Sequence, residues 1–128
     1  MFKKVGTVSL FVADQQRAKT FYTEKLGFEL RADNPLYPGA DNRWIAVAPH
    51  GAETELILYL PDENWTHYAG VVGQSQAITL EVSEIDSLVE HLKGNGVQII
   101  SEPEHQPWGT FAMIEDSEQN RLILVQPA

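Results

Sequence analysis

The sequence predicts an α+β fold built from two βαβββ modules in tandem. First, the letters ELILYLP at 55–61 are nearly repeated as RLILVQP at 121–127. Second, an alternating strand pattern at 7–14 returns 70 residues later at 77–84. Third, a helical pattern follows each alternating strand. Self-similarity at a fixed spacing indicates a duplicated unit of supersecondary structure.

A chain of 128 residues with 43% hydrophobic residues is long enough to bury a core. We expect one domain, 1–128, made of repeats at about 1–61 and 76–128 joined by a linker at 62–75. One module alone is marginal, because a single helix covers only one face of its curved sheet. Two modules can pair their sheet edges and enclose a cavity on the faces that carry no helix.

The first module opens with the strand at 7–14. Asp14 then suits the N-cap of a helix, and Gly27 suits its left-handed C-terminal cap. The rest of the module is expected to contain strands at 28–32, 43–48 and 54–60 and a proline-containing loop at 34–42.

The second module opens with the strand at 77–84. Ser83 and Asp86 then resemble a capping box, and the turn-forming Gly94-Asn95-Gly96 ends the helix. The rest of the module is expected to contain strands at 97–101, 110–115 and 121–126 and a proline-containing loop at 102–108.

Side chains alternate between the two faces of a strand, so the sequence assigns each strand residue to a face. The helix-facing set is apolar: Val8, Leu10, Val12, Leu56, Leu58, Ile78, Leu80, Val82, Leu122 and Leu124. The opposite, cavity-facing set is mixed: Thr7, Ser9, Phe11, Glu55, Ile57, Tyr59, Ala77, Thr79, Glu81, Arg121, Ile123 and Val125.

The chain carries 18 acidic and 9 basic residues, a formal net charge of −9. This balance argues against sequence-independent binding to nucleic acid or to an anionic membrane, which depends on Lys and Arg. There is no cysteine, which excludes disulfides and thiolate metal sites. No signal-peptide pattern or membrane span is visible, so we expect a cytoplasmic protein.

The stretches VSLFVAD…AKTFYTEKLGFEL, WIAVAP and FAMIEDSEQNRLILVQP resemble the vicinal oxygen chelate superfamily over essentially the whole chain. This group includes glyoxalase I, extradiol dioxygenases, fosfomycin-resistance enzymes and bleomycin-resistance proteins. The resemblance implies the paired-module fold and a homodimer. The family's Asp-Pro-x-Gly-Asn turn reads here Asp116 to Asn120 without its Pro and Gly. Gln119 is a poor residue for positive φ, so the turn is expected to differ in shape.

The resemblance also implies four metal-ligand positions, filled in family enzymes by His, Glu or Gln. Here they are Thr7, Ile57, Ala77 and Ile123. An alternative register moves one position to Tyr59, an unusual ligand. None of the four residues suits a divalent metal. We therefore expect no metal and no cofactor.

The four histidines, His50, His67, His91 and His105, have no spacing that would place two of them on one metal. We expect them to be surface residues.

The cavity is expected to bind a small organic molecule, with hydroxyls, carboxylates, a guanidinium and aromatic rings around apolar patches. Flat rings near its mouth are Trp44, Trp65, Tyr68, Trp108 and Phe111, which are alternatively edge or dimer contacts. The ligand-pocket prediction comprises Thr7, Ser9, Phe11, Trp44, Glu55, Ile57, Tyr59, Thr79, Glu81, Trp108, Phe111, Arg121 and Ile123.

Three functions stay open at this point. The first is a metal-free binding protein whose acidic charge suits a cationic ligand. The second is a glyoxalase-like lyase or isomerase, or a dioxygenase, with an unrecognised metal set or with acid–base catalysis by Glu81 or Glu55. Those carboxylates are alternatively hydrated or paired with Arg121 or Arg43. The third is a vestigial cavity in a protein that acts through its surface.

Overall fold

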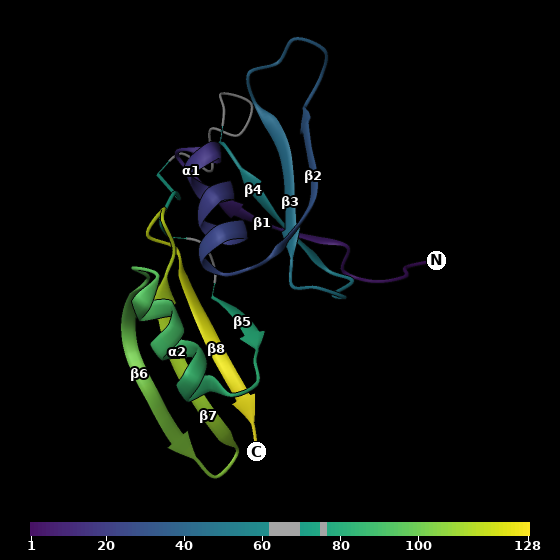
Figure 1. The fold of residues 1–128 in the computed structure, drawn as a ribbon. Coiled ribbons are helices and arrows are strands. Elements are labelled where there is room, and N and C mark those ends of the chain that lie inside the picture. The colour runs from purple at the N-terminus through teal and green to yellow at the C-terminus, as the bar shows by residue number, and fades with distance from the viewer. Residues whose placement is uncertain (62–69, 75–76) are drawn as a thin grey trace.

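The computed structural model describes residues 1–61, 70–74 and 77–128, and Figure 1 shows two modules, each with a helix against a four-stranded sheet. The first module contains β1 (Thr7–Phe11), α1 (Gln15–Thr20), η1 (Phe21–Lys25), β2 (Glu29–Pro35), β3 (Arg43–Ala48) and β4 (Glu55–Tyr59). The second contains β5 (Ile78–Glu81), α2 (Ile85–Gly94), β6 (Gln98–Gln106), β7 (Gly109–Glu115) and β8 (Arg121–Pro127). The predicted tandem βαβββ architecture is confirmed.

The two sheets have the same topology. Sheet A has the order β1-β4-β3-β2, and sheet B has the order β5-β8-β7-β6. The first and last strands of each module run parallel, with Val8 beside Leu56 and Ile78 beside Leu122. The repeated Leu-Ile-Leu letters therefore occupy equivalent central strands, which explains why the sequence repeats there.

The helix-facing residues form the core, as predicted. Six of the ten are buried and the other four pack against the same cluster, which also contains Tyr22 from η1 and Val89 from α2. Among the described helices, none is both long and apolar enough to cross a membrane.

The first helix differs from a regular α-helix. It begins at the predicted N-cap, where Asp14 accepts a hydrogen bond from the Arg17 N–H, but after Thr20 it widens into the π-helix η1. The Leu26 N–H bonds to the Phe21 carbonyl five residues back, at 3.1 Å. Phe21 and Tyr22, the first two residues of this wider turn, are both buried. Gly27 then has the predicted positive φ, 76°.

The predicted capping box of the second helix is wrong. The N-cap is Glu84, in the left-handed region at φ 51°, and it makes no side-chain cap bond. Instead the Ile85 N–H donates to the Gln126 side-chain oxygen at 2.8 Å. The Gln126 side chain on β8 thus accepts a hydrogen bond from a backbone N–H group in the first turn of α2. Because Gln126 is far from α2 in sequence, the residues around the helix start do not predict this cap.

The predicted loop at 102–108 is also wrong over most of its length, because β6 continues to Gln106. Register shifts surround Ser101, and one of them accommodates Pro103. Proline lacks a backbone donor, and it is tolerated here because β6 is an edge strand with irregular pairing. This extension matters for the site, since it brings Glu104 into the sheet.

The two modules meet at the turn between β7 and β8. Buried Glu118 accepts hydrogen bonds from the Ala13 and Asp14 N–H groups and from the Arg17 guanidinium, all at 2.7–3.0 Å. Gln119 adopts φ 65° despite its poor propensity. No strand pairing joins the two sheets within the described ranges, so the expected pairing of module edges is not present inside one chain.

Candidate functional site

The helix-free face of sheet B carries a row of side chains that crosses all four strands. Glu104 lies opposite Phe111, Phe111 opposite Val125, and Val125 beside Glu81. We call these four residues the acidic row. Neighbouring strands are about 4.8 Å apart, so three strand spacings separate the backbones of the two glutamates by about 14 Å across the sheet. Both glutamates are exposed, whereas Phe111 and Val125 are half-buried between them.

Two aromatic side chains, Trp108 and Phe111, form what we call the aromatic platform, and Phe111 belongs to the acidic row. The rings of Trp108 and Phe111 are stacked, with centroids 5.6 Å apart and planes 16° apart. Trp108 is 56% exposed, although it lies against another ring. The platform therefore offers a flat apolar surface that is open to solvent, between two negative charges.

The next rows on this face are less charged. Met113 lies opposite Ile123, which in turn lies beside Thr79. Arg121 lies opposite Glu115, so a carboxylate faces the one guanidinium that was predicted for the pocket. The negative charge of the face is consequently concentrated in the acidic row.

The helix-free face of sheet A is more closed. Phe11 and Tyr59 make an edge-to-face contact with centroids 6.2 Å apart. Ile57 is completely buried, while Thr7 and Ser9 on β1 are exposed. Trp44 on β3 is 37% exposed.

The expected partners of Glu55 are corrected by the structure. Its carboxylate pairs with Arg31 at 3.4 Å, and Arg31 also contacts Glu29 at 2.6 Å. Arg43 instead forms a bidentate ion pair with the Asp33 carboxylate. The hydrogen bond from Arg43, aided by Lys19 and opposed by partial burial, lowers the pKa of Asp33 to about 2. No ion pair of Glu81 occurs among the described residues.

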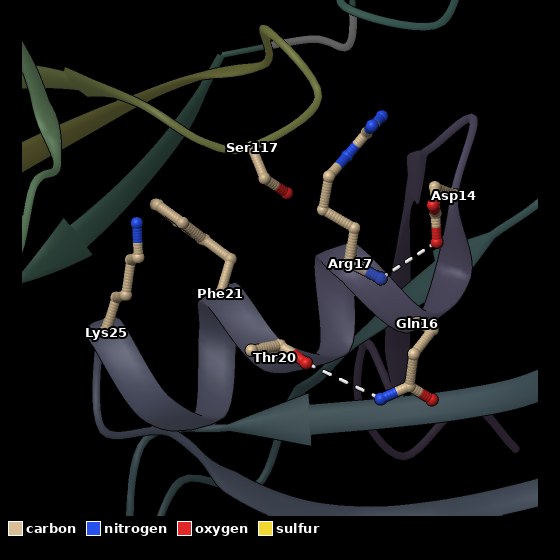
Figure 2. Close-up of a pocket in the computed structure, with 7 residues that line it drawn as sticks. All are labelled: Asp14, Gln16, Arg17, Thr20, Phe21, Lys25 and Ser117. Atoms are coloured by element: carbon tan, nitrogen blue, oxygen red, sulfur yellow. Dashed lines mark hydrogen bonds between the residues drawn. The ribbon is translucent and has the colours of Figure 1, made fainter.

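An open cavity of about 510 Å³ lies at the joint between the modules. Figure 2 shows its lining on α1 and η1, with Ser117 reaching in from the β7–β8 turn: Asp14, Gln16, Arg17, Thr20, Phe21, Lys25 and Ser117. Arg17 is neutralised there by Glu118 at 2.7 Å. The cavity is thus built around the contact that joins the modules.

The joint also contains a buried polar cluster. The Tyr22 hydroxyl donates to the Asp116 carboxylate at 2.7 Å, which in turn accepts from the backbone N–H of Glu118 and of Asn120. Burial raises the pKa of Tyr22 well above its usual 10, and the charge of Asp116 adds to the shift. The Asn120 amide donates to the Phe11 carbonyl at 2.9 Å and so ties β8 to the end of β1.

The residues at the four family metal positions do not fit a metal. Thr7 and Ala77 are exposed, Ile57 is buried and Ile123 is half-buried. Three of these four residues have no donor atom in the side chain. Across the described ranges, no group of three or more His, Cys, Asp or Glu residues could hold a metal ion.

The histidines are dispersed. His50 contacts Glu29 at 2.8 Å, His91 is exposed on α2, and the His105 Nδ1 lies 2.8 Å from the Thr110 hydroxyl. His67 falls outside the described residues, as do the predicted aromatic residues Trp65 and Tyr68.

The structure brings together only part of the predicted pocket. Thr79, Glu81, Trp108, Phe111, Arg121 and Ile123 share one face of sheet B, and Thr7, Ser9, Phe11, Trp44, Glu55, Ile57 and Tyr59 belong to sheet A. Sequence reasoning missed Glu104 and Met113 on the first of these faces, and Arg31 on sheet A. The stretch Glu102 to Gln106 has no alternation of apolar and polar residues, and Pro103 pointed to a loop, so no local signal placed Glu104 in a strand.

Comparisons with known proteins agree with this geometry. Residues 4–124 match the family model of the Glyoxalase/Bleomycin resistance protein/Dioxygenase superfamily. The chain is 40% identical to the uncharacterized protein YetH of Bacillus subtilis, over 97% of this chain and 98% of that protein. It is 28% identical to a lactoylglutathione lyase of Salmonella typhimurium, over 91% of this chain and 87% of the lyase.

A solved structure is also similar. It is TnmS3, an antibiotic binding protein from Streptomyces sp. CB03234, with 35% sequence identity and a TM-score of 0.83. The match covers 99% of this chain and 98% of that one. The similarity therefore spans both modules and includes the strands of the acidic row.

Proposed function

Because the chain belongs to the Glyoxalase/Bleomycin resistance protein/Dioxygenase superfamily, we propose that it binds a small, flat, cationic organic molecule without a metal ion. The ligand stacks on Trp108 and lies along the acidic row of sheet B. The single observation that carries this proposal is the stacked aromatic platform flanked by Glu81 and Glu104.

The geometry suits such a ligand in size and in charge. A span of about 14 Å between the backbones of Glu81 and Glu104 accommodates two or three fused rings with a basic group at either end. A cation over a tryptophan ring gains about 0.5–2 kcal/mol, depending on how far it is desolvated. The net charge of −9 adds long-range attraction for cations.

Two observations favour binding over metal-dependent catalysis. The family's ligand positions hold Thr, Ile, Ala and Ile, which cannot fix a divalent ion on the helix-free faces. The similarity to TnmS3, an antibiotic binding protein, supports sequestration of a small molecule. Sequestration requires affinity for the ligand but no chemical reaction.

A second copy of the chain would complete the site. The helix-free faces belong to separate sheets, and β1 and β5 are edge strands whose outer backbone groups no other described strand pairs. Pairing of β1 from one copy with β5 of another would join a sheet A face and a sheet B face into one continuous surface and satisfy both edges. A closed two-fold homodimer is the simplest assembly that does this twice.

A comparison of a planar cationic dye with a planar anionic dye tests this function. Acridine orange, a planar cation, is expected to bind at least about tenfold more tightly than the planar anion fluorescein, since both carboxylates favour the cation. The double variant Glu81→Gln/Glu104→Gln should reduce this preference to near unity. The measurement is a fluorescence titration of each dye at low salt.

The matched control for that experiment is Glu24→Gln/Glu53→Gln, which removes two exposed carboxylates elsewhere and changes the net charge equally. It should retain most of the preference. Equal binding of both dyes to the unmodified protein would contradict the proposal.

A further inference from the structure

A second cavity lies on the helix side of sheet B, where the first module contacts the second. It is partly enclosed and has a volume of about 140 Å³. The first module contributes Leu26, Phe28 and Pro49 to its wall. The rest of the wall comes from α2 and from the strands of sheet B. We call this space the apolar cavity.

The wall of the apolar cavity is chemically uniform. Among the described residues that form it, nine are apolar and one, Glu81, is charged. Side chains alternate along a strand, so Leu80 and Val82 face the core while the Glu81 carboxylate belongs to the opposite face of sheet B. A buried water molecule needs about two to four polar partners, and the described side chains that face this cavity offer none. Water is therefore held weakly there, and an apolar molecule can displace it.

The part of the wall that the first module supplies is fixed in place. The Phe28 N–H donates to the Tyr22 carbonyl at 2.9 Å, and the centroids of these two rings are 5.6 Å apart. At the end of α2, the Asn95 side-chain amide donates to the Lys25 carbonyl at 3.3 Å, next to Leu26. These contacts hold the segment between η1 and β2 against the second module. The cavity is therefore preformed, which reduces the entropy that a ligand loses on binding.

The cavity also has a path to solvent. Pro49 is exposed and Phe28 and Leu88 are half-buried, so these residues mark the mouth. Leu92 and Ile114 are buried in the core and mark the floor. Native interiors rarely keep voids larger than a water molecule, because the atoms that line a void lose their packing contacts. A void of this size that is open at one side is thus typical of a binding pocket.

We propose that the apolar cavity binds a small, uncharged, apolar molecule of about the size of one aromatic ring. Its volume is close to that of an engineered apolar cavity of about 150 Å³ in another protein, which binds benzene or xenon. A charged molecule is disfavoured, because it would lose its hydration without gaining a polar partner. The apolar cavity and the acidic row lie on opposite faces of sheet B, so this site does not depend on the proposed function.

Benzene is the probe for this site. In methyl NMR spectra of the full-length protein, benzene should shift the resonances of Leu88, Leu92 and Leu124, which line the cavity. The resonances of Leu10 and Leu58, in the core of the first module, should stay unchanged. Benzoate, a charged molecule of similar size, should bind at least about tenfold more weakly at neutral pH.

Variants that fill the cavity give the matched test. Val82→Phe places a ring in the space that benzene would occupy, and should weaken benzene binding at least about tenfold. Leu88→Phe is a second filling variant with the same expected loss, and it decides the test if Val82→Phe does not fold. The control is Val8→Phe, at another half-buried, helix-facing valine that belongs to the first module. It should retain the affinity within about twofold.

The melting temperature supplies a second readout. Benzene at about ten times its dissociation constant should raise the melting temperature of the unmodified protein by about 3–8 °C, and that of the filled variants by less than about 1 °C. Methyl shifts confined to Val125, beside the aromatic platform, would overturn the cavity as the binding site. Unchanged affinity in the filled variants, or an equal loss in Val8→Phe, would also overturn it. The acridine orange titration judges the proposed function separately, because that dye is a cation.

Discussion

Trp108→Ala is expected to weaken acridine orange binding by about 10- to 100-fold, which corresponds to the loss of about 1–3 kcal/mol of stacking and cation–π energy. The reason is structural. Trp108 presents an open ring face above Phe111, and alanine leaves a narrower, non-planar surface between the same two carboxylates. The measurement is a direct titration of the variant alongside the unmodified protein.

Tyr37→Ala is the control for this prediction, because Tyr37 is also an exposed aromatic residue but lies between β2 and β3, away from sheet B. Its affinity for the dye should stay within about twofold of the unmodified protein. If the two variants lose affinity equally, the dye is binding to exposed rings in general and the platform has no special role.

Glu118→Ala is expected to destabilise the fold by about 3 kcal/mol in urea denaturation at neutral pH. The buried carboxylate accepts from two backbone N–H groups next to the start of α1 and from the Arg17 guanidinium, so its removal breaks the joint between the modules. Glu53→Ala, at an exposed glutamate, should change the free energy of unfolding by less than about 0.5 kcal/mol.

The effect of Glu118 should also depend on pH. Burial, the largest single influence, opposes ionisation, but the hydrogen bonds from Arg17, Asp14 and Ala13 outweigh it and lower the pKa of Glu118 below its usual 4.5. A lowered carboxyl pKa in the folded state adds stability above the unfolded pKa, and this stability is lost as the pH falls through the folded one. The difference in stability between the unmodified protein and Glu118→Ala should therefore shrink below pH 4.5. A difference that stays constant down to pH 3 would contradict this role.

Much of the fold can be predicted from the sequence because its strands and helix ends are determined by residues that are close together in the chain. Period-two alternation in 7–14 and 77–84 identified the helix-facing residues, and burial of an apolar face enforces that choice. Asp14 and Gly27 acted as helix caps because their chemistry is local to the helix ends. The family resemblance rested on the same local stretches.

The remaining features depend on contacts between distant segments. The Gln126 side chain caps the second helix, and the turn carrying Glu118 fixes the first, yet neither partner is near its helix in sequence. Pro103 suggested a loop, whereas an irregular edge strand accommodated it and brought Glu104 opposite Phe111. The acidic row could not be predicted without that register, although Glu81, Trp108 and Phe111 were each proposed for the pocket.

Binding without a metal ion is tested most directly by calorimetric titration of chelator-treated protein with acridine orange. We expect saturable binding at one dye per chain, with the same affinity before and after Zn²⁺, Ni²⁺ or Mn²⁺ is supplied. Heat of binding that appears only after one of these ions is restored would contradict a ligand site built from the aromatic platform and its two flanking carboxylates.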